Sequence, residues 1–129
     1  MEEKIKYEME FNLRTSVSIL YSKLSTPSGL ADWFSDDVNV SRDGKIFSFI
    51  WEQSEENAHL LSKNRDSSVR FKWEEDEEEE SYFEFVIKAD PITSSVALFI
   101  TDFAEEDEIE DGKKLWASQI ESLKNAIGA

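Results

Sequence analysis

Residues 112–128 read GKKLWASQIESLKNAIG, and this stretch predicts the element around which the rest of the fold is arranged. Its apolar residues recur at three- and four-residue steps, which is the spacing of one face of an α-helix. They are Leu115, Trp116, Ile120, Leu123 and Ile127. The acidic run from Glu105 to Asp111 suits the positive end of a helix dipole, and Gly128 is placed as a C-terminal stop. We therefore expect a long helix from Gly112 whose apolar stripe must be buried.

Most of the chain before this helix has the patterns of β-strands. Lys4 to Leu13 alternate polar and apolar side chains, which predicts a half-buried strand. Asp43-Gly44 is a strong hairpin signal, and Asp90-Pro91 marks a second turn. Further strands are expected over residues 38–40, 46–52, 58–63, 68–74, 82–89 and 94–103.

Two short helices are expected between the first strand and the others. Thr15 or Ser16 suits the N-cap of the first helix, and Thr26-Pro27 suits the N-cap and first position of the second. The second helix is expected to run from Pro27 to about Phe34. The apolar positions of the pair are Val17, Leu20, Tyr21 and Leu24, then Leu30, Trp33 and Phe34.

The order strand, helix, helix, about six strands, helix indicates an α+β fold in a single domain over residues 1–129. Strands joined by tight turns pair antiparallel. A lone amphipathic helix must bury its stripe against one face of such a sheet. We expect a curved antiparallel sheet of about six or seven strands wrapped around the C-terminal helix. The space between sheet and helix is a natural ligand pocket.

This order of elements resembles the helix-grip fold of the START/SRPBCC superfamily. The spacing Pro27…Leu30…Trp33-Phe34 is similar to a signature of the Aha-type branch, which contains activators of the heat-shock-protein ATPase and many small bacterial proteins. Thr101-Asp102-Phe103, then Gly112, Trp116 and Leu123, look like the last strand and gripping helix of that branch. The resemblance implies a START-like fold. Members bind lipids, sterols, polyketides or plant hormones, or act as co-chaperone modules, and a minority are enzymes.

Composition excludes several classes of function. Fourteen basic and twenty-nine acidic residues give a net charge of −15, which repels nucleic acid and anionic membrane surfaces. The chain has no cysteine, so it has no disulfide, thiolate metal site or cysteine nucleophile. Met1 to Glu10 lack an apolar signal core, and no apolar run approaches the roughly 20 residues that span a bilayer. We expect a cytoplasmic protein without membrane insertion.

Aromatic side chains are the main candidates for a binding site. The sixteen Phe, Tyr and Trp residues are concentrated on the expected strands, where core packing and cavity lining both account for them. The residues predicted to bind a ligand are Trp33, Phe34, Phe49, Phe71, Phe85, Asp102, Trp116 and Ile120. Strands 47–51 and 83–85 carry apolar residues at both parities, which suggests a covered outer face and leaves a homodimer open.

Polar residues point to no catalytic or metal site, and no cofactor is expected. His59 is the sole histidine and is expected to be exposed or to lie on an edge strand. The acidic run Glu74–Glu80 is interpreted as a mobile, solvated hairpin loop, with weak cation condensation as the alternative. Glu105–Asp111 is interpreted as a solvated loop, with an alternative as a docking surface for a basic partner. Alternation places Arg70 outward. Asp102 shares the parity of the inward apolar residues and is a candidate polar group of the site.

Three functions remain open from the sequence. The first is binding of an apolar small molecule or lipid-like ligand between sheet and helix, driven by burial of apolar area. The alternative is a co-chaperone-like interaction module whose acidic surface contacts a basic protein. An enzyme would require polar groups with perturbed pKa values that converge in the cavity.

Overall fold

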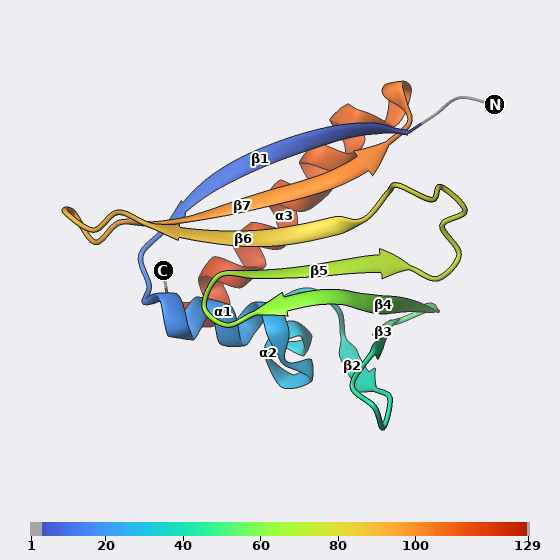
Figure 1. Cartoon of the computed structure of the whole chain (residues 1–129), viewed down its shortest axis with the longest axis horizontal. Helices are drawn as coiled ribbons and strands as arrows, with labels where there is room; N and C mark the ends of the chain where they lie inside the picture. Colours follow the sequence, from blue (N-terminus) through green and yellow to red (C-terminus); the bar gives the residue numbers. More distant parts are fainter. Residues whose placement is uncertain (1–3, 129) are drawn as a thin grey trace.

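The computed structural model describes residues 4–128 and contains one seven-stranded sheet (Figure 1). The strand order is β1-β7-β6-β5-β4-β3-β2, and every pair of neighbours is antiparallel. The strands are β1 (Ile5–Leu13), β2 (Asp37–Val40), β3 (Ile46–Trp51), β4 (Ser54–Asn64), β5 (Ser68–Trp73), β6 (Phe83–Ala89) and β7 (Val96–Ala104). The helices are α1 (Val17–Ser25), α2 (Pro27–Ala31), the 3₁₀ turn η1 (Glu106–Glu108) and α3 (Ile109–Ile127).

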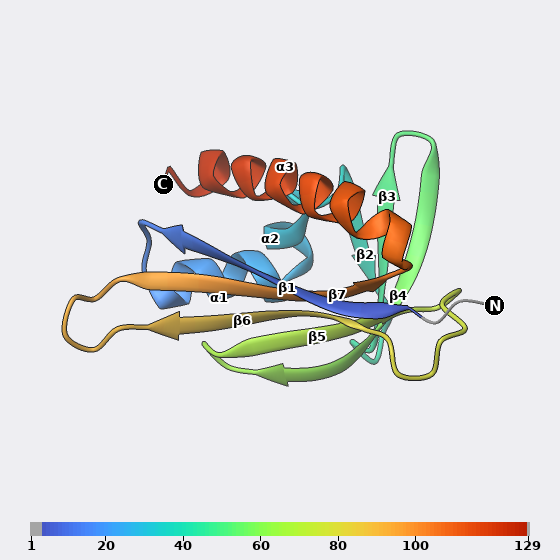
Figure 2. The same cartoon turned by 90° about the horizontal axis from the view of Figure 1, so that it is seen from above.

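The sheet curves around the helices. Figure 2 shows α3 over one face of the sheet with α2 on the same side, and α3 also contacts β1 and β7 directly. The hairpin of β3 and β4 turns up at one end and approaches the beginning of α3. The predicted curved antiparallel sheet with a gripped C-terminal helix is therefore confirmed.

The core lies between the concave face of the sheet and the helices. The α3 stripe contributes Trp116, Ile120 and Leu123, which are buried. Leu20 and Leu24 of α1 join the same cluster, together with the inward side chains of β3, β5, β6 and β7. Because these side chains leave water together, they provide the main driving force for folding.

Helix caps follow the predicted chemistry, but two helix boundaries differ. The Ser16 hydroxyl accepts a hydrogen bond from the Ile19 amide at 3.2 Å, and Thr26 does the same for Gly29 at 3.0 Å. The second helix ends at Ala31 and not near Phe34, because the amides of Asp32 and Trp33 bond to carbonyls three residues back, in a tight turn that leads Trp33 and Phe34 into the core.

The long helix begins earlier than predicted, and its stripe is narrower. It starts at Ile109, so Gly112 lies inside its first turns. Glu110 and Asp111 in the first turn favour this earlier start because they interact with the positive end of the helix dipole. Leu115 was expected to belong to the stripe, but it is 61% exposed, because it lies about 100° around the helix axis from the buried Trp116. Gly128 ends the helix in the left-handed conformation, as predicted.

Strand boundaries differ most in β4. The prediction of residues 58–63 missed its first four residues, which pair with β3 although their sequence, Ser-Glu-Glu-Asn, has a weak strand propensity. The last strand begins at Val96 and not at Ser94, because Ser94 has a φ of 61° within the turn that follows Asp90.

No helix within residues 4–128 is both long enough and apolar enough to cross a membrane. The sequence prediction for Met1 to Glu10 includes residues 1–3, which lie outside the described part of the chain.

Candidate functional site

A pocket of about 400 Å³ opens between the first turns of α3 and the β3–β4 hairpin. Figure 2 shows these two elements approaching each other at one end of the molecule. The lining side chains come from β1, β3, β4, β5, β7, α3 and the segment after α2. They are Tyr7, Phe34, Trp51, Ser54, Glu56, Trp73, Asp102, Gly112, Leu115, Trp116 and Gln119.

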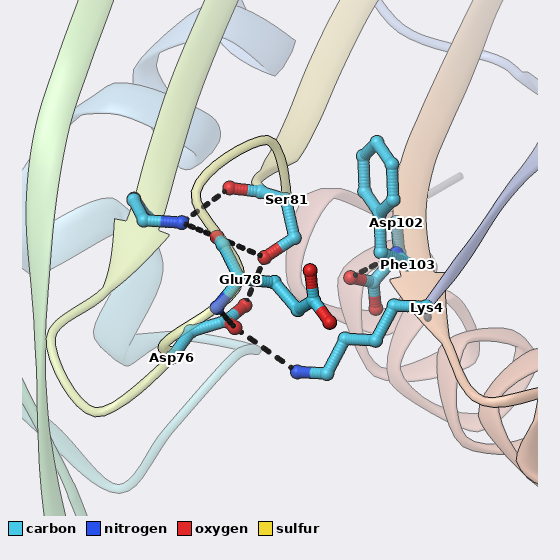
Figure 3. Close-up of polar contacts among 7 residues, drawn as sticks. Lys4, Asp76, Glu78, Ser81, Asp102 and Phe103 are labelled. Carbon is cyan, nitrogen blue, oxygen red and sulfur yellow. Dashed lines mark hydrogen bonds and ion pairs between the residues drawn. The ribbon is translucent and has the colours of Figure 1, made fainter. Parts of the chain in front are cut away.

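Asp102 is the charged group at the inner end of this pocket. It lies on β7 and continues the inward parity of Leu98 and Ile100. Its Oδ2 accepts hydrogen bonds from the Trp116 indole N–H at 2.9 Å and from the Tyr7 hydroxyl at 3.3 Å. Its Oδ1 accepts the Phe103 amide at 2.8 Å, a bond that Figure 3 draws. All three neighbours are donors, and such an arrangement stabilises an ionised carboxylate.

Burial nevertheless raises the pKa of Asp102 above its ordinary value, and the bonds from Trp116, Phe103 and Tyr7 oppose this rise. Burial also raises the pKa of Tyr7, and the negative charge of Asp102 raises it further. Tyr7 therefore stays a neutral hydroxyl that donates to Asp102.

Gly112 allows Tyr7 to reach Asp102. A β-carbon at this position would lie 2.4 Å from the Tyr7 hydroxyl oxygen and 3.2 Å from the ring carbon that carries it. The absence of a side chain on Gly112 thus permits α3 to lie directly against the tip of Tyr7. The first turns of the helix and the first strand are held together here by the shared carboxylate of Asp102.

The apolar wall of the pocket is built around Phe34. Its ring stacks on Trp116 with centroids 5.8 Å apart and meets Trp51 edge-on, also at 5.8 Å. Its carbonyl oxygen accepts the Trp51 indole N–H at 3.2 Å. Trp73 stacks on the Phe34 ring at 6.4 Å. The turn that follows α2 therefore places the Phe34 ring between sheet and helix.

The mouth of the pocket is polar on the hairpin side. Ser54 pairs with Trp51 and Glu56 pairs with Phe49 across the β3–β4 ladder, so both side chains point to the concave face of the sheet. Both residues are exposed. Leu115 adds an exposed apolar group from α3, and Gln119 completes this edge.

The structure brings together three of the eight residues that the sequence proposed for ligand binding. Phe34, Asp102 and Trp116 line the pocket. The other five are Trp33, Phe49, Phe71, Phe85 and Ile120, which are buried in the core and do not line this pocket. They fill the interior, where aromatic rings pack against one another. The ring centroids of Phe71 and Phe83, for example, are 5.2 Å apart.

Most of the residues that line the pocket were not predicted from the sequence. Tyr7 and Trp73 had the right inward parity, but they were not singled out among many aromatic residues. Glu56 was missed because the beginning of β4 was not recognised as strand, so its inward parity with Ala58 was not considered. Gly112 was interpreted as a helix start and as part of the resemblance to the Aha-type branch, and no local signal indicates its contact with Tyr7.

The acidic run Glu74–Glu80 was expected to be solvated, but one of its side chains is largely buried. The Asp76 side chain is only 9% exposed and forms an ion pair with Lys4 at 3.2 Å. Figure 3 shows this pair beside Ser81, whose hydroxyl donates to Asp76. Burial tends to raise the pKa of Asp76, but the bonds from Ser81 and the Glu78 amide, with Lys4, hold the pKa below its ordinary value.

Other polar candidates lie away from the pocket. Arg70 faces outward as predicted and binds Glu84 through its Nε at 3.0 Å. His59 is 45% exposed as predicted, but it lies on the inner strand β4 and has a carboxylate partner, Glu74, at 3.3 Å. Glu105, Asp107 and Glu108 bring carboxylate oxygens within 4.8 Å of one another around η1, at the surface.

Comparison with known proteins identifies the family. The family model of the START-like superfamily domain matches residues 1–129. The chain belongs to the START-like superfamily. Members of this superfamily generally bind hydrophobic ligands. None of the curated proteins compared with the chain matches it.

Solved structures agree with this START-like assignment. A Bacteroides fragilis protein solved by solution NMR is 39% identical, with a TM-score of 0.69, and the match covers 97% of this chain and 91% of that one. The Aha1 dimer from Colwellia psychrerythraea is 16% identical, with a TM-score of 0.79 and coverage of 95% and 96%. Protein MLL2253 from Mesorhizobium loti is 14% identical, with a TM-score of 0.76 and coverage of 96% and 97%. The last two show similarity of fold alone.

Proposed function

We propose that this START-like chain binds an apolar small molecule in the pocket between the β3–β4 hairpin and the first turns of α3. The observation that carries the proposal is the pocket itself, which has a volume of about 400 Å³ and five aromatic lining residues. Sites for small molecules commonly have volumes of roughly 300–1,000 Å³ and combine apolar walls with few polar groups. Here Asp102 and Tyr7 supply polar groups at the inner end.

Affinity would come from two sources. Burial of the ligand's apolar body against Trp51, Trp73 and Leu115 contributes about 25 cal/mol per Å² of apolar area removed from water. The packed Phe34 cluster holds the wall rigid before binding, which reduces the ordering cost of association. The alternative, docking of a basic protein, is supported only by the net charge of −15.

The test is native mass spectrometry of the purified protein for co-purified molecules, followed by titration with fatty alcohols, sterols and aromatic metabolites. Indole fluorescence reports binding because Trp51, Trp73 and Trp116 line the pocket. Ser54→Trp, which places a large ring at the mouth, should weaken binding. Ser67→Trp, an exposed position in the β4–β5 turn outside the pocket, should not. No co-purified molecule and no response to any compound would refute the proposal.

A further inference from the structure

The charged side chains that line the pocket are all acidic. Asp102 lies at the inner end and Glu56 at the mouth, and the lining includes no Lys, Arg or His. Within residues 4–128, no ion pair joins either carboxylate to a basic side chain. A buried carboxylate without a counter-ion is costly unless hydrogen bonds or a bound cation compensate it.

Lys4 is the basic side chain whose charge acts on Asp102. It does not neutralise Asp102, because its Nζ forms an ion pair with Asp76 at 3.2 Å (Figure 3). The protein supplies Asp102 with three neutral donors, from Tyr7, Trp116 and Phe103. Oδ2 accepts two of these bonds and Oδ1 only one, so Oδ1 retains acceptor capacity.

The remaining walls favour positive charge as well. Trp51 and Trp73 are half-buried, and with Phe34 they form an aromatic surface near the mouth. Aromatic faces carry negative quadrupole density and attract ammonium groups, with Trp the strongest. Glu56 points to the same concave face as Trp51, since its ladder partner Phe49 lies two residues from Trp51 on the same side of β3. An anionic ligand would meet two carboxylates here and no basic partner.

We propose that the pocket binds an organic cation, in which an amine or quaternary ammonium group is attached to an apolar body. The cationic group lies between the carboxylates of Asp102 and Glu56 and against the indole faces, and the body packs on Leu115 and the aromatic wall. This inference rests on the proposed function and specifies its ligand class. The net charge of −15 also speeds the encounter with a cation.

The experiment compares three probes with the same ten-carbon chain: decylammonium, decan-1-ol and decanoate. Titrations are followed by indole fluorescence and calorimetry at about pH 8, where ordinary carboxyl groups are ionised and an alkylamine is protonated. Decylammonium should bind about tenfold more tightly than decanol, and decanoate should bind most weakly.

Variants separate the pocket from the charge of the whole protein. Glu56→Gln should reduce the preference for decylammonium over decanol about threefold, and Asp102→Asn about tenfold. Glu8→Gln removes one charge from an exposed position on β1 outside the pocket, so it should leave the preference unchanged. Glu56 is exposed, so its variant tests the idea even if Asp102→Asn does not fold.

The following results would contradict the proposed cation preference. Equal binding of all three probes, or tightest binding of decanoate, overturns the inference and leaves the proposed function intact. A cation preference that survives both pocket variants, or that falls equally in Glu8→Gln, also overturns it, because the total charge then explains the preference. If no probe binds, the inference is overturned, and the proposed function is decided separately by native mass spectrometry and the wider panel of sterols and aromatic metabolites.

Discussion

Gly112 and Tyr7 are in such close contact that a β-carbon on Gly112 would lie 2.4 Å from the Tyr7 hydroxyl oxygen. This contact joins the first turns of α3 to the first strand, and it positions Tyr7 to donate to Asp102 at 3.3 Å. The side wall of the pocket therefore depends on a missing side chain.

Gly112→Ala should lower the free energy of unfolding. In an exposed helix the same change stabilises by about 1 kcal/mol, but here the new methyl group displaces Tyr7 from Asp102. In a Tyr7→Phe background, where the clashing oxygen is absent, Gly112→Ala should be less harmful by about 1 kcal/mol or more. Urea unfolding of the four proteins in this double-mutant cycle measures the coupling. Additive effects would show that the contact has no energetic consequence.

Asp102 should make stability fall as pH rises. Its pKa is raised in the folded state, so the folded protein holds the proton more tightly than the unfolded chain. Relative to Asp102→Asn, the wild type should lose stability as pH rises from about 4, the ordinary carboxyl value, through the folded-state pKa. Urea unfolding at a series of pH values gives the difference, in which the contributions of the other carboxylates largely cancel. A difference that is flat across this range would contradict the assignment.

Asp76 should show the opposite dependence. Its pKa is lowered in the folded state, so the stability that it contributes is present above about pH 4 and is lost as pH falls through the folded-state pKa. Asp76→Asn should therefore be less stable than wild type at neutral pH, and the two proteins should converge in acid. The same slope for Asp76 and Asp102 would show that one of the two environments has been misassigned.

Phe34→Ala should be among the most destabilising substitutions in the chain, by about 3–5 kcal/mol. Phe34 is buried, and its ring packs against aromatic rings from the sheet and from α3. Its centroid lies 4.9 Å from that of Phe49 and 5.8 Å from that of Trp116. Phe99→Ala provides a matched control on the other face of the sheet, where Phe99 is half-buried beside Lys88. Its loss in thermal or urea unfolding should be clearly smaller. Equal losses would mean that Phe34 is not central to the core.

Leu115→Ala should separate stability from binding. The side chain is 61% exposed, so the free energy of unfolding should change by less than about 0.5 kcal/mol. Because Leu115 lines the pocket, affinity for a bound apolar compound should fall a few-fold. Ile19→Ala changes another exposed apolar residue, 52% exposed on α1, and should affect neither property. An unchanged affinity in Leu115→Ala would remove this residue from the site.

Local sequence patterns predicted most elements of the fold. The alternation in β1, the capping residues Ser16 and Thr26 and the glycine stop at Gly128 all depend on neighbours within a few residues. Such patterns can be recognised from the sequence alone. The predicted boundaries were wrong where tertiary contacts outweighed local conformational preference. At the beginning of β4, pairing with β3 holds polar residues of weak strand propensity in an extended conformation.

The candidate site was less predictable than the fold. Parity alone placed Asp102 inward, and the stripe placed Trp116 on the buried face of α3. Parity cannot distinguish a ring that lines a pocket from one that fills the core, as Phe49 and Trp51 show. That difference depends on which side chains from other elements surround each ring.

The sequence by itself determined the order of elements, the antiparallel sheet and the apolar stripe of α3, because periodicity and turn chemistry act between residues close in the chain. Only the tertiary structure decided which residues meet at the pocket. Tyr7, Asp102 and Gly112 are separated by up to 105 residues along the chain and are brought together by the pairing of β1 with β7 and by the path of α3. The physical reason is that contacts between distant segments depend on the packing of whole elements, which no local pattern records.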